Sequence, residues 1–132
     1  MFKKALLIGV ANLIVGFGIN WLVGLLLPTV QKEYEGGLFR PWTDPLMLVF
    51  FAYPFILGFV LVYLWDKVKG NLKGDKTTQA FEFAKLYFIV ATVPGMFITY
   101  TSFQISLSMV LLWTATGFLE ALVAGIIISR VK

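Results

Sequence analysis

The chain of 132 residues contains no cysteine and no histidine. The absence of cysteine excludes disulfide bonds, thiol nucleophiles and thiolate metal sites, and the absence of histidine excludes imidazole as an acid, a base or a metal ligand. Charged residues are also scarce, at 14% of the chain. The sequence has no P-loop, no dinucleotide-binding glycine motif and no HExxH motif. We therefore expect no enzymatic activity, no metal site and no cofactor.

Apolar residues dominate what is present. Hydrophobic residues make up 59% of the chain and aromatic residues 17%, and the mean hydropathy is +0.86. Four apolar runs are each long enough to cross a bilayer core of about 30 Å, which takes about 20 helical residues. The sequence therefore predicts an all-α membrane protein with a single transmembrane domain over residues 1–132. The predicted helices cover residues 5–27, 45–65, 80–100 and 103–128.

Residues at the ends of the runs predict where the helices begin. Asp44 stands before a proline, which is typical of a helix start because the acid caps free amides and proline has no amide to leave unpaired. Thr101 and Gln104 fit the S/T-x-x-E/Q capping box and predict a tight turn before the fourth helix. The polar linker 66–79 contains glycines and separates two helical hairpins of similar length. We expect the two hairpins to form one bundle.

Lysine and arginine lie mainly at one set of helix ends. The loop over residues 28–44 carries only Lys32 and Arg40. The positive-inside rule places the more basic ends in the cytoplasm. We therefore expect a multi-pass cell-membrane protein with both termini and the linker cytoplasmic, and with residues 28–44 as the outer loop. This placement explains the net charge of +4 without a nucleic-acid partner. The other basic residues are Lys3, Lys4, Lys67, Lys69, Lys73, Lys76, Lys85, Arg130 and Lys132.

Glu120 is the only ionisable side chain deep inside an apolar run. A charged carboxylate near the bilayer centre costs at least about 2.5 kcal/mol, so it is expected only where the protein compensates it. At about 100° per residue, Glu120 shares one face of its helix with Thr116 and other small or polar side chains. Beside this face, Gly117, Ala121 and Gly125 form a small-x-x-x-small pattern that lets another helix approach closely. We expect Glu120 to face protein and the small residues to be the candidate contact with another chain.

The first run carries a stripe of small and amide side chains at three- or four-residue spacing, which predicts a packing seam between membrane helices. Asn12 and Glu120 have the same predicted depth, each about 4 to 6 Å to the cytoplasmic side of the midpoint of its run. We predict that they hydrogen-bond, directly or through water, with Thr116 as a second donor. The stripe consists of Ala5, Gly9, Asn12, Gly16, Asn20 and Gly24. The predicted intramembrane polar cluster consists of Glu120, Asn12, Asn20 and Thr116.

Proline interrupts the second and third runs at Pro54 and Pro94. Inside a membrane helix, proline frees a carbonyl and commonly kinks the helix. We expect kinks at both positions, which either open an aqueous or lipid-accessible cavity above Glu120 or fit aromatic bulk, and we favour the second. Aromatic residues in the outer loop are typical of a belt at the headgroup level. The alternative is that residues 38–42 form a lid or a partner-binding edge over the outer mouth of the bundle.

Two functions remain open. The preferred interpretation is a non-enzymatic packing, assembly or partner-binding protein, whose partner besides the lipid bilayer is a second copy or another membrane protein. The alternative is a small proton- or cation-linked transporter or channel that uses Glu120 near the midplane. The size and four-helix plan resemble those of the small multidrug transporters and the fluoride channels. The former have their membrane Glu in the first helix, and the Gly-Gly-x-Thr-Thr-Phe-Ser-Thr-Phe stretch of the latter is absent here.

Overall fold

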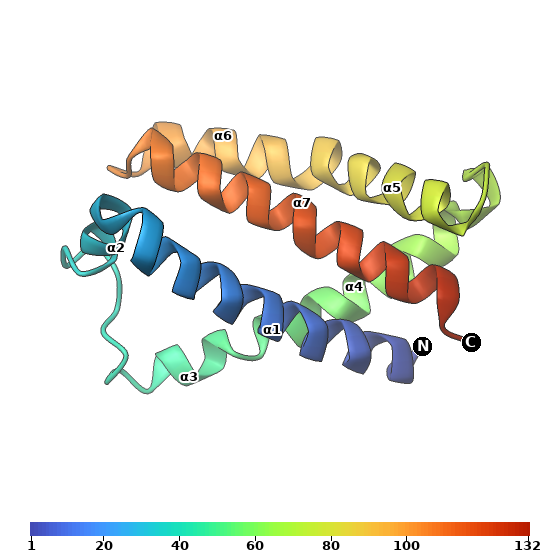
Figure 1. Ribbon diagram of the computed structural model, residues 1–132, viewed down its shortest axis with the longest axis horizontal. Coiled ribbons are helices and arrows are strands. Elements are labelled where there is room, and N and C mark those ends of the chain that lie inside the picture. The colour runs from blue at the N-terminus through green and yellow to red at the C-terminus, as the bar shows by residue number, and fades with distance from the viewer.

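The computed structural model describes residues 1–132, and every regular element is a helix. Four helical segments are long and apolar enough to cross a membrane: Phe2–Leu26, Leu46–Asn71, Lys76–Ser102 and Leu107–Arg130. The predictions of an all-helical chain and of four candidate spans are therefore confirmed. The elements are α1 (Phe2–Leu26), α2 (Pro28–Tyr34), α3 (Leu46–Phe50), α4 (Tyr53–Val68), the 3-10 helix η1 (Lys69–Asn71), α5 (Lys76–Tyr87), the π-helix η2 (Phe88–Thr92), α6 (Val93–Ser102) and α7 (Leu107–Arg130) (Figure 1).

The second span is divided just before Pro54. Helix α3 ends at Phe50, and α4 begins at Tyr53. Pro54 has no amide hydrogen, so it cannot donate the helical bond that the carbonyl of Phe50 would accept. Figure 1 shows a bend where α3 meets α4. The proline therefore marks the point where the outer part of this span changes direction.

The third span contains a wider helical turn. Helix α5 passes into the π-helix η2, and α6 follows with Pro94 in its first turn. Local π turns are among the ways in which membrane helices re-satisfy the backbone groups that a proline leaves unpaired. The disturbance expected at Pro94 thus takes the form of a π turn directly before it.

The fourth helix begins later than residue 103, and the predicted capping box is wrong. Helix α6 continues to Ser102, and the Thr101 hydroxyl donates to the carbonyl of Phe97 at 3.0 Å inside that helix. Ser106 caps α7 instead, because its Oγ accepts a hydrogen bond from the amide of Met109 at 3.1 Å. The turn between the third and fourth spans therefore comprises residues 103–106.

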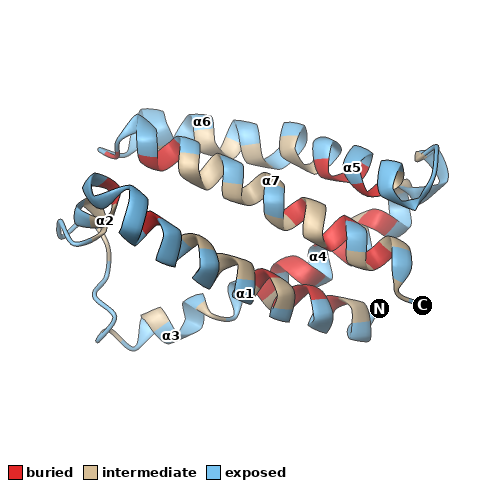
Figure 2. Cartoon of the chain, in the orientation of Figure 1, coloured by how far each residue is buried: buried red, intermediate tan, exposed pale blue.

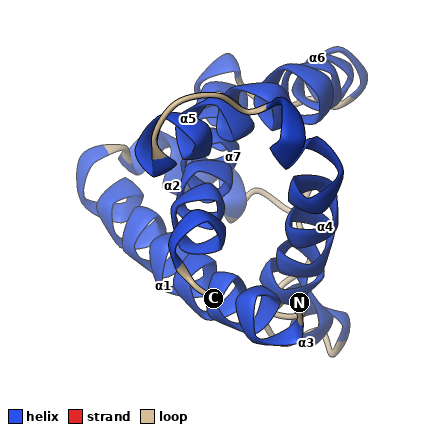
Figure 3. Cartoon of the chain, turned by 90° about the vertical axis from the view of Figure 1, so that its right-hand side faces the viewer, coloured by secondary structure: helices blue, strands red, loops and turns tan.

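The long helices pack mainly as two antiparallel pairs, α1 with α4 and α5 with α7. Small residues allow the closest approach in each pair. A methyl group added at Gly58 would lie 2.5 Å from the carbonyl oxygen of Ala5, and one added at Gly125 would lie 2.8 Å from that of Ala80. Helix α1 also packs against α7, which joins the pairs, as the end-on view in Figure 3 shows.

Buried side chains form two clusters, one toward each end of the molecule. The larger cluster lies at the end that carries both termini, where Figure 2 shows most of the buried residues. It consists of Ala5, Ile8, Leu57, Leu61, Val62, Trp65, Phe83, Ala124 and Ile128. The smaller cluster consists of Val23, Val30, Ile105, Met109 and Val110, and it ties α2 to the outer ends of α1 and α7.

Large apolar side chains also cover the outside of the helices. Phe97 exposes 71% of its surface, and α3 and α6 contain no buried residue at all. In a protein surrounded by water, the hydrophobic effect would favour burial of such side chains. Lipid, by contrast, solvates them as well as a protein core does. The apolar exterior is therefore the surface expected of helices that lie in a membrane.

Candidate functional site

Glu120 lies midway along α7, which packs against α1, α4, α5 and α6. The side chain is partly buried. It forms neither a hydrogen bond nor an ion pair with the chain, whose ion pairs are Arg40–Asp44, Lys69–Asp66 and Lys85–Glu82. An ionisable group that the protein leaves without a partner inside a candidate membrane span is the centre of the candidate site.

Two tyrosines from other helices approach Glu120. Tyr53 in the first turn of α4 and Tyr87 at the end of α5 both lie within electrostatic range of its carboxylate. Tyr53 exposes 48% of its surface, so only part of its side chain is covered by the chain. A phenol can donate a hydrogen bond to a carboxylate, and its ring face attracts cations. The residues around Glu120 are therefore suited to hold a proton or a cation.

Asn12 on α1 is the only buried polar residue in the chain, with 2% of its surface exposed. Neither its amide nitrogen nor its amide oxygen has a hydrogen-bond partner. The contacts between Gly9 and Phe55, and between Ala5 and Gly58, set the antiparallel register of α1 and α4. One turn further along α1, this register places Asn12 level with the start of α4, where Tyr53 lies. Asn12 and Tyr53 therefore share a depth in the bundle.

No hydrogen bond in the structure joins two members of the predicted polar cluster. Asn12 makes no hydrogen bond to Glu120, so the direct bond that we predicted is absent. Thr116 is not a second donor either, because its hydroxyl donates to the carbonyl of Leu112 at 2.8 Å in its own helix. Asn20 is exposed on the outer half of α1 and lies apart from the site. The outer half of α1 does not pack against α4, because α4 begins only at Tyr53.

The small residues on the inner half of α1 are packed, and those on its outer half are not. Gly9 is buried, and its Cα faces the ring of Phe55 so closely that a methyl group would collide with it. Gly16 and Gly24 have no atom near the position of an added methyl group. The predicted seam therefore packs against α4 over its inner half and is open over its outer half.

The small residues of α7 pack within the chain. A methyl group at Gly117 would lie 3.0 Å from the side chain of Thr92, and Gly125 meets the backbone of Ala80. Ala121 is fully buried between these two positions. The candidate contact with another chain is thus already occupied by the third span. The prediction failed because a small-x-x-x-small pattern does not reveal whether its partner helix belongs to the same chain.

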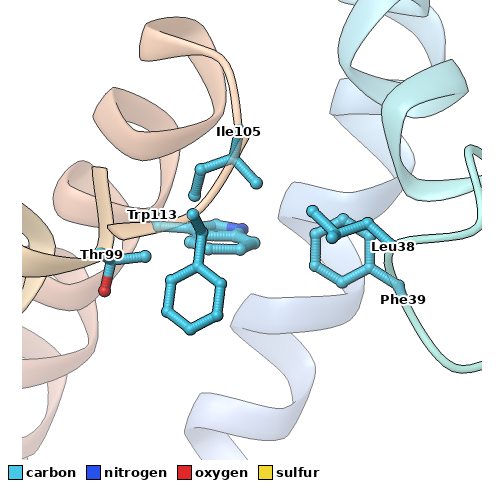
Figure 4. A pocket seen from close by; sticks show the side chains of 6 residues that line it. Leu38, Phe39, Thr99, Ile105 and Trp113 are labelled. Atoms are coloured by element: carbon cyan, nitrogen blue, oxygen red, sulfur yellow. The ribbon is translucent and has the colours of Figure 1, made fainter. Parts of the chain in front are cut away.

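A second feature lies at the outer end, where a cavity of about 260 Å³ separates the outer loop from the turn between α6 and α7. Figure 4 shows Leu38 and Phe39 facing Trp113 and Ile105 across it. Leu38 and Phe39 line this cavity, whereas Trp42 stacks on the ring of Phe51 at 5.9 Å. Whether residues 38–42 act as a lid stays a prediction. The cavity is lined by Leu38, Phe39, Thr99, Phe103, Ile105 and Trp113.

Two polar contacts hold α2 beside this cavity. The Glu33 carboxylate accepts hydrogen bonds from the Ser106 amide at 2.7 Å and from its hydroxyl at 2.6 Å. An acid at the first turn of α7 also interacts favourably with the helix dipole. Trp113 Nε1 donates to the Tyr34 hydroxyl at 2.6 Å, and burial raises the pKa of Tyr34. Thr99 donates to the carbonyl of Gly95, so both lining side chains with a polar atom, Thr99 and Trp113, are paired and the lining is otherwise apolar.

Sequence reasoning missed several of these residues. Tyr87 follows Ala80, Phe83 and Ala84 on one buried face of α5, and this helical spacing was a signal that could have pointed it inward. The contacts of Glu33 with Ser106 and of Tyr34 with Trp113 join residues more than seventy positions apart. No local pattern indicates such pairs.

No group of three or more Asp, Glu, His or Cys side chains lies close enough together to hold a metal ion. The groups that the structure gives around the candidate site are the Glu120 carboxylate and the Tyr53 and Tyr87 phenols, with the Asn12 amide at a similar depth. Comparisons of the chain with protein-family models, curated proteins and solved structures found no match.

Proposed function

We propose that this chain is a small membrane protein that binds one proton or one monovalent cation at Glu120, as a proton- or cation-linked transporter or channel. The observation that carries the proposal is that the Glu120 carboxylate has no hydrogen-bond or ion-pair partner in the chain, while two tyrosines from other helices lie in its electrostatic range. A carboxylate used only to fix helix packing would be expected to bond to a neighbouring helix.

The physical argument concerns what neutralises Glu120. An unpaired negative charge in a membrane interior costs at least about 2.5 kcal/mol, and much more by some estimates. Because the chain supplies no positive partner, the charge is neutralised by a proton or by a bound cation. A single carboxylate holds one of either.

The test compares Glu120→Gln with Glu82→Gln in proteoliposomes that carry a proton, sodium or potassium gradient. Glu82 is the matched control because it lies on the surface of α5 in an exposed pair with Lys85. We expect flux through the wild-type protein and through Glu82→Gln, and none through Glu120→Gln. Thermal unfolding in detergent should show that Glu120→Gln remains folded, since the substitution removes no bond within the chain.

The second candidate function is assembly with a second copy or another membrane protein. The observation that favours it is that α3 and α6 contain no buried residue, so whole helix faces stand free of contacts within the chain. The same experiment separates the two functions. Absence of flux through the wild-type protein, combined with a loss of stability in Glu120→Gln, would contradict transport and support assembly.

We further infer the orientation from the charge distribution. The termini and the α4–α5 linker lie at one end of the molecule (Figure 1), and this end carries most of the basic residues. Basic segments are retained in the cytoplasm. The termini therefore face the cytoplasm of a cell membrane, and the α1–α3 connection faces outward. Since the interior holds no nucleophile with an adjacent base, we infer a binding or transport role rather than an enzymatic one.

A further inference from the structure

We propose that the end of the molecule with the two termini binds anionic phospholipid headgroups. Its basic residues come from distant parts of the sequence, namely the start of α1, the end of α4, the linker before α5 and the end of α7. Figure 1 shows that these segments meet at one end. The fold thus gathers into one surface charges that the sequence distributes over its full length.

Direct contacts bring these helix ends together. Lys4 Nζ donates to the carbonyl of Ile128 at 3.4 Å, which joins the start of α1 to the end of α7. Arg130 donates to the Thr77 hydroxyl at 2.7 Å, which joins the end of α7 to the start of α5. The helix ends that carry the basic side chains are therefore joined to one another by hydrogen bonds.

Most of these charges are not neutralised within the chain. The acids at this end are already engaged: Asp66 pairs with Lys69 at 2.8 Å, and Glu82 pairs with Lys85 at 2.7 Å. The Asp75 carboxylate accepts the amide of Thr78 at 2.8 Å and caps α5. Hydrogen bonding to Thr78, from its side chain first and its amide second, lowers the pKa of Asp75. Five lysines at this end are exposed and have no acidic partner: Lys3, Lys67, Lys73, Lys76 and Lys132.

The position of the charges points to lipid headgroups as the partner. They lie at the ends of the candidate spans, which is the depth at which headgroups stand. Lys67 extends over the ring of Tyr63 with 5.3 Å from Nζ to the ring centroid, and Lys85 lies 5.9 Å over Phe81. This is the arrangement of a lysine that runs its stem along an apolar surface and holds its ammonium group at the interface.

The opposite end of the molecule has no excess of basic residues. Its basic residues are Lys32 and Arg40, and the latter pairs with Asp44 at 2.9 Å. Glu33 and Glu35 lie at the same end, so its acids outnumber its bases. Electrostatic complementarity to anionic lipid is therefore confined to one leaflet.

The test measures how strongly the full chain, in nanodiscs, retains spin-labelled phosphatidylglycerol relative to spin-labelled phosphatidylcholine. Nanodiscs expose both faces, so the result does not depend on orientation. We expect a preference for phosphatidylglycerol that weakens as salt is raised. Lys73→Gln with Lys76→Gln should reduce the preference by up to roughly 25-fold, since each lysine near an anionic surface contributes a factor of roughly five.

The control is Lys32→Gln with Arg40→Gln, which removes the same charge from the other end and should leave the preference unchanged. Both lysines of the test variant are exposed and unpaired, so the fold should persist, and thermal unfolding checks this. Equal retention of the two lipids by the wild-type protein, or equal losses in the two variants, overturns the proposal. Displacement of phosphatidylglycerol by inorganic phosphate beyond the effect of chloride at the same ionic strength would instead identify a site for the free anion, and it also overturns the proposal.

Discussion

Asn12 is the residue whose burial is hardest to reconcile with stability alone. Its amide is almost completely enclosed, yet both of its polar atoms lack partners. Leaving a buried polar group unpaired costs about 1 to 3 kcal/mol. Unsatisfied groups of this kind in native proteins call for an explanation such as a functional role. Because Asn12 lies at about the depth of Tyr53, the proposed binding site at Glu120 would supply such a role.

Replacing Asn12 with leucine tests this interpretation. Leucine has a similar size and no polar atoms, so we expect Asn12→Leu to raise the free energy of unfolding by about 1 to 3 kcal/mol. Reversible unfolding in mixed micelles measures the change. If Asn12 takes part in cation binding, the same variant loses flux while it gains stability.

Asn20→Leu is the control, because Asn20 is exposed on the same helix and should change stability little in either direction. A clear loss of stability in Asn12→Leu would contradict the prediction. It would show that the amide of Asn12 has a bonding partner in the membrane.

At the scale of helices, small residues decide which spans pack closely. Lipid provides no hydrophobic drive for helices to associate, so close backbone contact and van der Waals packing must hold them together. Gly58 makes this contact in the α1–α4 pair, and Gly125 makes it in the α5–α7 pair. Gly16 on the outer half of α1 makes no such contact. Glycines on membrane helices therefore differ in their importance according to the neighbour they face.

We expect Gly125→Ala to destabilise the protein by about 1 to 3 kcal/mol, because overpacking of this size must push α5 away from α7. The added methyl group would lie 2.8 Å from the carbonyl oxygen of Ala80 and 3.1 Å from its Cα, and a backbone cannot move aside as a side chain can. Unfolding of the detergent-solubilised protein measures the loss.

Gly16→Ala provides the contrast, since alanine is favoured over glycine in a helix by up to about 1 kcal/mol. We expect it to be neutral or stabilising. Equal destabilisation by both variants would mean that Gly16 is also a close contact, and the missing neighbour would then be a second chain.

At the scale of the whole molecule, the structure has two differently charged ends joined by an apolar middle. The end with the termini is basic, and the end with α2 contains the Glu33–Ser106 contact and the apolar cavity. The division also appears in the packing, because the larger buried cluster lies at the basic end. The outer half is more open, since α3 and α6 bury nothing. We expect movements of the protein to be concentrated in that half.

The orientation of the molecule is tested by single cysteines, which the cysteine-free chain accepts without background labelling. The exposed positions Glu35, Asn71 and Lys132 report on the outer loop, the linker and the C-terminus. A membrane-impermeant maleimide should label Glu35→Cys in intact cells, and it should label the other two only after lysis. Labelling of Glu35→Cys and Asn71→Cys from the same side would contradict the four-span topology itself.

Much of the fold was predictable because its determinants are local. The four candidate spans follow from apolar runs of sufficient length, and the bend at Pro54 follows from the missing amide of proline. The predicted capping box failed because Thr101 finds an alternative partner in the preceding helical turn, which a four-residue motif does not reveal. Glu120 was identifiable as the site centre because of the cost of its charge. Its neighbours were harder to predict, and the direct bond to Asn12 does not form.

The sequence by itself determined that the chain is helical, that it has four spans suited to a membrane, and that one carboxylate lies inside them, since chain length, hydropathy and charge are properties of each segment alone. Only the tertiary structure decided which faces meet. It placed Tyr53 and Tyr87 near Glu120, occupied the small residues of α7 with the third span, and gathered distant lysines at one end. The physical reason is that lipid solvates all apolar helix faces about equally well, so the choice of partners among them depends on the fit between backbones rather than on a pattern within one helix.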